Sequence, residues 1–373
     1  MTQIAILQTA FLGDTLLSIP LAKQLALKGE RLALICRKGY GGLFLATRLF
    51  ENVIEIEKGN SVSYREAEEA LNIWWSDSDR RILLSPHESP RSKMFALSLR
   101  MKGAATATIG YRDRGLAQGP SFAAYSDRVA RPMEMPEALR QLALLQSPLI
   151  SGAEDAAMWT TRLADFAAAQ ELPGGRLKSG ALMEVPEWAS MKIETLVPAR
   201  IGQSEIREKV AVLSPGSVWR TKQWTEEGFI EVGRRFASLG KQVVLTGTKE
   251  EAELCERIAL GIGEGARSIA GEITLLETAH EMSRAEVAVV NDSGGMHVAA
   301  IADTPVVAIF GPTILDFGYR PWSNKARVVE PGPLECRPCG LHGSQVCPIG
   351  THICMKATTA DTVWHQVQSL LNL

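Results

Sequence analysis

The sequence predicts an α/β protein of two domains, each built on an open parallel sheet. Short apolar runs alternate with stretches of helical spacing, which is the pattern of parallel strands joined by helices. This pattern starts afresh at Val210, after a stretch between Pro186 and Pro198 with weak periodicity. A chain of 373 residues also exceeds one usual hydrophobic core. We therefore expect domains at residues 1–185 and 210–355, a connector at 186–209 and a C-terminal segment at 356–373.

In the first half, apolar runs predict strands at residues 3–7, 31–36, 52–56 and 81–84, and helical spacing predicts helices after Thr15 and at 42–49, 91–101 and 154–170. No basic segment precedes the first run, so we interpret it as a buried strand and not as a signal peptide. Gly13 and Asp14 follow this strand. They are expected at the carboxyl edge of the sheet, where open parallel sheets bind ligands.

In the second half, strands are predicted at residues 210–213, 242–245, 287–290 and 304–310, and helices at 226–239, from 249, at 275–283 and at 360–371. The loops that follow these strands are rich in Ser, Thr and Gly. Loops on one edge of a sheet can converge on one ligand.

The stretch 287–300 passes from β-branched residues through Asn291-Asp292-Ser293-Gly294-Gly295 into a helix. Free N–H groups and the helix dipole at such a junction favour an anion, and the glycines let a ligand approach the backbone. Asp292 would repel a bare phosphate, so we expect it to cap the helix or to face sugar hydroxyls or an amide. An ordinary capped helix remains the alternative.

Composition indicates a globular protein, with 46% hydrophobic and 22% charged residues. The net charge of −2 argues against wholesale nucleic-acid binding. No run approaches the roughly 18 apolar residues that span a bilayer, so a cytoplasmic location is expected. Residues 80–140 are nevertheless locally basic. This excess indicates either a solvated surface or contact with an anionic acceptor or a membrane surface.

Four cysteines cluster near the C-terminus: Cys336, Cys339, Cys347 and Cys354. They match the ligand count of a tetrahedral site, and zinc or iron bound there would pin a loop that lacks a core of its own. Free reduced thiols are the alternative, and disulfides fit a cytoplasmic protein less well. Cys36 and Cys255 are expected to be single buried residues.

Several motifs together resemble one known family, the bacterial lipopolysaccharide heptosyltransferases of glycosyltransferase family 9. They are Gly13-Asp14-Thr15, Arg91-Ser92, Ile109-Gly110-Tyr111-Arg112, Ser214-Pro215-Gly216-Ser217 with Lys222-Gln223-Trp224, Asn291–His297 and Phe310-Gly311-Pro312-Thr313. The resemblance covers essentially the whole chain. It implies the GT-B fold: two doubly wound Rossmann-like domains facing across a cleft, with the C-terminal helix packing back on the N-terminal domain.

The resemblance implies inverting, metal-independent transfer of heptose from ADP-heptose to the Kdo/heptose inner core of lipopolysaccharide. The donor would bind the second half and the acceptor the first, with peripheral contact at the inner membrane and no cofactor required for catalysis. Two alternatives are an ADP-heptose-dependent protein (autotransporter) heptosyltransferase and a non-catalytic nucleotide-sugar-binding scaffold. A nicotinamide dehydrogenase is disfavoured because the first βα turn lacks the G-x-G-x-x-G fingerprint.

By resemblance, Lys222, Ser217, Ser293 and Gly294 contact the donor diphosphate, and Asp292 contacts the donor. His297 is a further donor residue, or packs beneath the loop. Glu250 or Glu251 would accept hydrogen bonds from the ribose hydroxyls, with solvated helix-start acids as the alternative. The family usually has proline at the position of Gly295, and this departure leaves the loop less preorganised.

Asp14 matches the family's proposed general base, which would act together with Lys222 and Asp292 in catalysis. Alternatively it caps a helix that begins at Thr15. Arg91, Lys93 and Arg112 are candidates for binding the anionic acceptor, whose Kdo carboxylates and lipid A phosphates would account for the basic excess. Similar cysteines occur in some members of the family, so the cluster resembles a subfamily feature.

Overall fold

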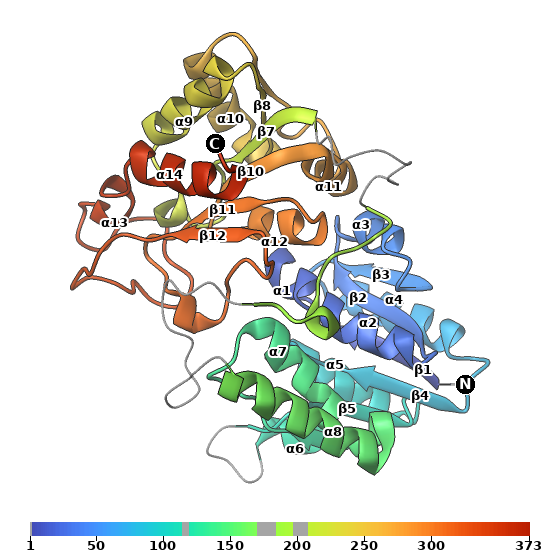
Figure 1. Cartoon of the computed structure of the whole chain (residues 1–373). Helices are drawn as coiled ribbons and strands as arrows, with labels where there is room; N and C mark the ends of the chain where they lie inside the picture. Colours follow the sequence, from blue (N-terminus) through green and yellow to red (C-terminus); the bar gives the residue numbers. More distant parts are fainter. Residues whose placement is uncertain (1, 114–118, 170–183, 197–207) are drawn as a thin grey trace. The chain divides into compact units, whose positions relative to one another are not determined.

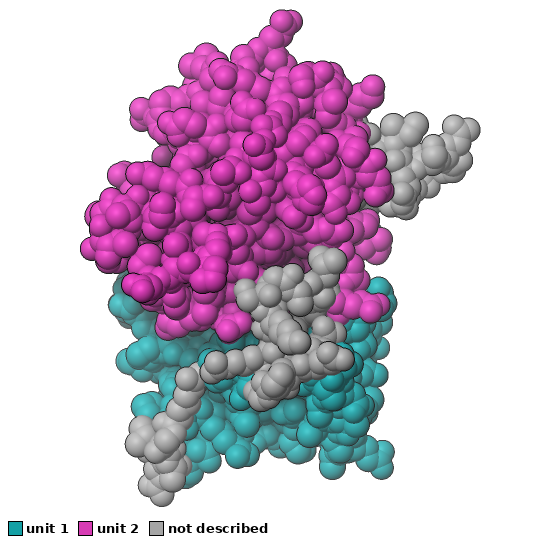
Figure 2. All heavy atoms as spheres, turned by 60° about the vertical axis from the view of Figure 1, so that its left-hand side comes forward, with its two compact units in different colours: residues 1–177, 186–189 teal, residues 178–185, 190–373 magenta. Residues whose placement is uncertain are grey.

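The computed structural model describes residues 2–113, 119–169, 184–196 and 208–373. The chain divides into two compact units, residues 1–177 with 186–189 and residues 178–185 with 190–373 (Figure 2). This division falls beside the connector expected at 186–209, part of which lies outside the described residues. The stretch Leu172-Pro173-Gly174-Gly175, whose Pro and Gly residues are typical of a helix end, also lies outside the described residues.

The first unit contains a six-stranded parallel sheet in the order β3-β2-β1-β4-β5-β6 (Figure 1). Its central strand β1 is buried along its whole length, as expected for a parallel sheet covered on both faces. The strands are β1 (Thr2–Leu7), β2 (Arg31–Arg37), β3 (Asn52–Ile56), β4 (Arg80–Leu84), β5 (Ala107–Tyr111) and β6 (Asp127–Val129).

Helices cover this sheet, and one part of its core joins Leu71 and Phe95 to the apolar strand residues Leu7 and Ile35. The helices are α1 (Leu12–Leu16), α2 (Ile19–Leu27), α3 (Gly41–Ala46), α4 (Ser61–Trp74), α5 (Pro90–Met101), α6 (Pro120–Ala124), α7 (Glu137–Leu142) and α8 (Pro148–Ala169), with 3-10 turns η1 (Ala143–Gln146) and η3 (Glu187–Ala189).

The second unit repeats the design with the parallel order β12-β11-β10-β7-β8-β9. Its strands are β7 (Glu208–Ser214), β8 (Gln242–Leu245), β9 (Ala266–Ser268), β10 (Ala285–Asn291), β11 (Val306–Ile309) and β12 (Ala326–Val329). Its helices are η4 (Arg220–Lys222), α9 (Glu226–Ser238), η5 (Lys249–Glu251), α10 (Ala252–Ile262), α11 (Leu275–Arg284), α12 (Gly294–Ile301), η6 (Leu315–Phe317), α13 (Ile353–Lys356) and α14 (Ala360–Leu371). None of the described helices has the length and apolar character that crossing a bilayer requires.

The C-terminal helix α14 buries its apolar face within the second unit, whereas we expected segment 356–373 to pack on the first. Val363 and Val367, one helical turn apart, are fully buried in the core of the second sheet. Trp364 makes an edge contact with Phe236 of α9, with ring centroids 5.0 Å apart. This apolar stripe covers the sheet face beside β10, β11 and β12, which would otherwise stay exposed.

Candidate active site

The junction between β10 and α12 has the geometry predicted for an anion site. β10 ends at Asn291, α12 begins at Gly294, and the N-cap residue Ser293 makes no side-chain cap hydrogen bond. The first N–H groups of α12 therefore lack a capping side chain. Asn291 is fully buried. Its side chain bonds to the loop after β7, where Oδ1 accepts from Trp224 N (3.0 Å) and Nδ2 donates to Pro215 O (2.6 Å).

Asp292 does not cap α12. Its carboxylate forms an ion pair with the Lys222 ammonium (2.7 Å) and accepts a hydrogen bond from the Thr313 hydroxyl (2.5 Å). The Asp292 and Lys222 side chains are only 5% and 12% exposed. A pair this buried must have good geometry and additional hydrogen bonds to offset its desolvation, and Thr313 supplies one of them. The pair holds the Lys222 ammonium near the start of α12.

His297 lies one turn into α12 and is 2% exposed. Burial, and then the nearby Lys222 ammonium, lower its pKa to about 3, so the imidazole is neutral at physiological pH. Its Nδ1 atom has no hydrogen-bond partner within the described part of the chain. An unsatisfied buried nitrogen costs about 1–3 kcal/mol.

The loop after β7 carries Ser217, which is 9% exposed and whose hydroxyl accepts from Trp219 N (3.4 Å). The side chain of Glu251 lies directly against Gly216 of this loop, so closely that a Cβ atom on the glycine would collide with the carboxylate. Glu251 also accepts from Thr248 N (2.8 Å). Glu250 is exposed, with its pKa lowered by its own backbone N–H and the Thr248 hydroxyl. Of these two candidates, the structure brings Glu251 to the loop.

In the first unit, Asp14 lies half-buried at the carboxyl edge of the sheet. It is the third residue of α1, whose N-cap is Phe11, so the alternative of a cap for a helix beginning at Thr15 is wrong. The side chain of Gln141 in α7 donates to the Asp14 backbone carbonyl (3.0 Å) and fixes this turn. The Asp14 side chain therefore lies at the carboxyl edge of the first sheet, where open parallel sheets bind ligands.

Basic side chains that the sequence analysis missed lie at this edge. Arg37 at the end of β2 donates to Thr9 O (2.9 Å), and His87 after β4 bonds the Thr9 hydroxyl (2.9 Å). Burial and Arg37 lower the pKa of Lys58, while Asp14 raises it. Burial and the cations Lys58, Arg37 and Arg131 lower the pKa of His87 to about 4. The available signal was a cation just after a predicted strand, at residue 37 directly after strand 31–36 and at residue 58 two residues after strand 52–56.

The three predicted acceptor residues differ in their surroundings. Arg91 is exposed at the start of α5, close enough to lower the pKa of Lys58. Lys93 forms an ion pair with Asp113 (2.5 Å), with both side chains largely buried. Arg112 donates to the carbonyl of Arg128 (2.9 Å). Much of the local basic excess is bound internally, as shown by Arg80, Arg81, Arg100, Lys102, Arg131 and Arg140, which donate to carbonyls or pair with acids.

The four cysteines Cys336, Cys339, Cys347 and Cys354 lie on one segment after β12. Burial and then Cys339, with smaller effects of Cys336 and Cys347, raise the pKa of the Cys354 thiol. The backbone N–H of His352 lowers the pKa of Cys347. Across the described residues, no three or more His, Cys, Asp or Glu side chains approach closely enough to hold a metal ion. The four thiols are therefore not gathered as a ligand set in this structure.

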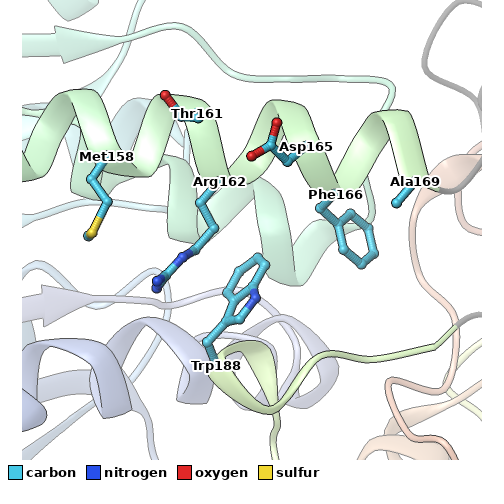
Figure 3. Close-up of a pocket in the computed structure, with 7 residues that line it drawn as sticks. All are labelled: Met158, Thr161, Arg162, Asp165, Phe166, Ala169 and Trp188. Carbon is cyan, nitrogen blue, oxygen red and sulfur yellow. The ribbon is translucent and has the colours of Figure 1, made fainter.

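Figure 3 shows a separate open pocket of about 570 Å³ along α8 in the first unit. Trp188 lies beneath the helix and makes T-shaped contacts with Trp159 (5.8 Å) and Phe166 (6.2 Å). The Arg162 guanidinium lies over the rings of both tryptophans. None of the predicted site residues lines this pocket.

Comparison with solved structures defines the class of the fold. Escherichia coli ADP-heptose lipopolysaccharide heptosyltransferase II matches with a TM-score of 0.66 at 22% identity, covering 100% of this chain and 99% of that one. The iron-containing dodecameric glycosyltransferase TibC of enterotoxigenic E. coli matches with a TM-score of 0.53 at 16% identity, covering 100% of this chain and 76% of that one. Two doubly wound units of this kind are the GT-B fold of glycosyltransferases.

Sequence comparison then gives the family. The model of glycosyltransferase family 9 (heptosyltransferase) matches residues 96–347, and the chain belongs to this family. The resemblance drawn from the motifs is thereby confirmed. Lipooligosaccharide heptosyltransferase 2 of Campylobacter jejuni (serotype O:2) is 29% identical over 168 residues, which are 44% of this chain and 51% of the relative. The chain spans about half the length of the first curated relatives it matches.

Proposed function

We propose that the protein transfers heptose, with inversion, from ADP-heptose to the inner core of lipopolysaccharide. Family membership and relatives described as lipooligosaccharide and lipopolysaccharide heptosyltransferases support this proposal. The structural observation that carries it is the Lys222–Asp292 ion pair at the start of α12. It places a fixed ammonium beside backbone N–H groups, which is the arrangement that a leaving diphosphate requires.

On the donor side, breaking the glycosidic bond puts additional negative charge on the departing ADP. In this proposal Lys222 and the N–H groups at Ser293 and Gly294 stabilise that charge without a catalytic metal, and the Ser217 hydroxyl contacts the same phosphates. Asp292 holds Lys222 and meets the sugar end of the donor. His297 packs beneath this loop, and we assign the ribose contact to Glu251 in place of Glu250, because the Glu251 carboxylate lies against the loop that carries Ser217.

On the acceptor side, Asp14 takes the proton from the attacking hydroxyl. Arg37 and Lys58 join Arg91 and Arg112 as ligands for acceptor carboxylates or phosphates. Lys93 remains a candidate acceptor ligand, held in place by its ion pair with Asp113. An acceptor anchored by lipid A also implies peripheral contact with the inner membrane. Co-sedimentation of the protein with anionic vesicles tests that contact, and no pelleting at low salt would count against it.

A donor screen tests the activity. ADP-, UDP- and GDP-linked sugars are incubated with the protein and a deacylated inner-core acceptor, and products are detected by mass spectrometry. The proposal expects a heptose-sized mass increase with ADP-heptose alone. NMR of the new anomeric centre reports inversion, and retention would contradict the single-displacement route. Turnover without added divalent cations is expected, and a requirement for added Mg²⁺ or Mn²⁺ would contradict metal-independent transfer.

A protein acceptor is the second candidate. The four cysteines and the fold likeness to the iron-containing TibC favour it. Incubating the chain with ADP-heptose and either an inner-core oligosaccharide or an autotransporter passenger domain separates the two. Labelling of the polypeptide alone would select this candidate over the first. ADP binding with no transfer to either acceptor would instead indicate a nucleotide-sugar-binding scaffold.

We further propose that Cys336, Cys339, Cys347 and Cys354 hold a structural zinc or iron ion. Four thiols on one short segment match the ligand number of such a site. The described side chains are not gathered as a ligand set, so metal binding would draw the four sulfur atoms together. The ion would neutralise thiolates that otherwise repel one another. Metal analysis of the purified chain should find close to one equivalent of zinc or iron. Absence of both metals would leave reduced thiols as the state of this segment.

A further inference from the structure

The segment Cys336–Cys354, here called the cysteine segment, is hydrogen-bonded to the loop that carries Lys222. Thr221 N and the Thr221 hydroxyl both donate to Ser344 O (3.1 and 2.8 Å), and the hydroxyl accepts from Ser344 N (2.8 Å). The Thr221 carbonyl bonds the Nε2 atom of His352 (2.8 Å). Every polar group of Thr221 is therefore bonded to the cysteine segment.

Thr221 is 4% exposed and directly precedes Lys222 in η4. Gly343 of the cysteine segment lies against the same place, because a Cβ atom on it would stand 3.0 Å from the Thr221 hydroxyl and 3.3 Å from Lys222 Cγ. A shift of the segment would therefore move the backbone that bears the lysine.

The cysteine segment also reaches the other partner of the ion pair. Cys339 N donates to Pro312 O (2.8 Å), and Arg337 donates to Gly311 O and Thr313 O (both 2.6 Å). Thr313 is the residue that donates to Asp292. The segment thus contacts both loops between which Lys222 and Asp292 meet.

Little else fixes the cysteine segment itself. No helix or strand lies between β12 and α13, and Leu341, Val346 and Ile349 are 67%, 76% and 56% exposed. A segment without an apolar core takes its shape from its polar contacts and its cysteines. Its conformation and that of the Lys222 loop therefore depend on each other.

We propose that the cysteine segment is a positioning element for the donor diphosphate, which sets the Lys222 ammonium through Thr221 on one side and Thr313 on the other. Thr221 is then a positioning residue and does not itself touch the substrate. This inference depends on the proposed function, in which Lys222 binds the diphosphate.

Substitution of Thr221 tests the contact, with ADP affinity measured by calorimetry on the full chain. Thr221→Val keeps the shape and removes the hydroxyl, and should weaken ADP binding by about tenfold. Thr221→Ser restores the hydroxyl and should stay within about twofold of wild type. The KM for the donor should rise with Thr221→Val while the KM for the acceptor stays unchanged, which a general loss of folding would not produce.

Two glycines of the segment give a matched pair of variants. Gly343 and Gly340 both have left-handed backbones, with φ of 77° and 79°, but a Cβ atom on Gly340 meets nothing within 4 Å. Gly343→Ala and Gly340→Ala therefore share the backbone strain and differ in contact with Thr221 and Lys222. Gly343→Ala should weaken ADP binding by about tenfold, and Gly340→Ala by less than about twofold.

Failure of this inference can be told apart from failure of the proposed function. If wild type binds no ADP, or Lys222→Ala binds it as tightly as wild type, the donor assignment itself is wrong. If Lys222→Ala weakens binding but Thr221→Val or Gly343→Ala does not, the lysine is held without the cysteine segment and the inference is overturned.

Discussion

The carboxyl edges of the two sheets hold their polar side chains in opposite ways. In the second unit they bond to one another: Asn291 joins two loops, Lys222 pairs with Asp292, and Thr313 and Thr221 support that pair. These groups are nearly all buried. Such a site is preorganised, and its donors are in place before a ligand arrives.

In the first unit the edge gathers like charges. Burial and then Arg37, with a smaller effect of Arg91, lower the pKa of the Lys58 ammonium. Burial and the cations Lys58, Arg37 and Arg131 lower the pKa of His87 to about 4 and keep its imidazole neutral. Cations that repel one another favour an anion among them. The two edges therefore differ in the ligands they favour. The preorganised network of the second unit suits one defined ligand, whereas the cationic edge of the first unit suits ligands selected mainly by their negative charge. The sharpest tests of this contrast are substitutions that act on one edge only.

The largest effect is expected for Asp14→Asn. Loss of the base should lower kcat by about 10²- to 10⁴-fold, while ADP affinity measured by calorimetry stays at the wild-type value. Asp77→Asn is the control, because it removes a carboxylate just before β4, at the opposite edge of the same sheet. Unchanged turnover in Asp14→Asn would exclude this carboxylate as the base.

A smaller loss is expected for Lys222→Ala. Removing the ammonium deletes a charge-assisted contact and leaves Asp292 buried without its partner, so ADP binding should weaken by about 10- to 100-fold. Calorimetry measures this directly. Lys209→Ala, at the opposite end of β7, serves as the control. Equal ADP affinities in the two variants would show that the network of the second unit does not meet the diphosphate.

Lys58→Ala should have a weaker effect, confined to the acceptor. One exposed cation contributes little alone, so the KM for an anionic acceptor should rise by about three- to tenfold, and less at high salt. The donor KM should not change. Lys38→Ala is closely matched, because Lys38 is exposed near the same edge but paired with Glu57 (2.9 Å). If both lysine variants raise the acceptor KM equally, the edge acts only through its overall charge.

The sequence was sufficient to predict the bounds of helices and strands that have strong apolar patterns. Strands at 52–56 and 242–245 and the helix at 360–371 have the predicted bounds. The edge strands β6 and β9 are three residues long and contain mostly polar residues, so no apolar run marks them. Helix α4 was not predicted, because its buried face includes Ser63 and Glu68, which weaken the apolar stripe.

The site was only partly predictable because its contacts join distant loops. The loop around Asp292 was visible locally, but its partners Lys222 and Thr313 lie 70 residues before and 21 after it. Gly-Asp-Thr resembles a helix cap, yet α1 begins earlier, at Leu12. Whether Glu250 or Glu251 faces the loop depends on the exact rotation of the helical turn that carries both, which the sequence does not fix. Nothing near Thr221 in sequence indicates that Ser344 and His352 bind it.

The smallest expected effect is on the pH dependence of folding stability. His297 in the second unit and His87 in the first each allow it to be measured at one edge. The pKa of His297 is about 3 and that of His87 about 4, both below the ordinary value of about 6.5. The unfolded chain therefore binds more protons as pH falls below about 6.5, and folding stability declines until the pKa of the folded state is passed. Each fully buried neutral histidine adds about 1.4 kcal/mol per pH unit to this decline.

Urea unfolding of the wild type, His297→Gln and His87→Gln between pH 7 and 5 measures these contributions. The slope of unfolding free energy against pH should be smaller in His297→Gln than in wild type, by an amount equivalent to the binding of nearly one proton, because the His297 side chain is fully enclosed. It should fall by less in His87→Gln, since His87 is only partly buried and water screens its neighbours. Equal reductions would mean that the first edge is as enclosed as the second. No reduction in either variant would place both histidines in contact with water.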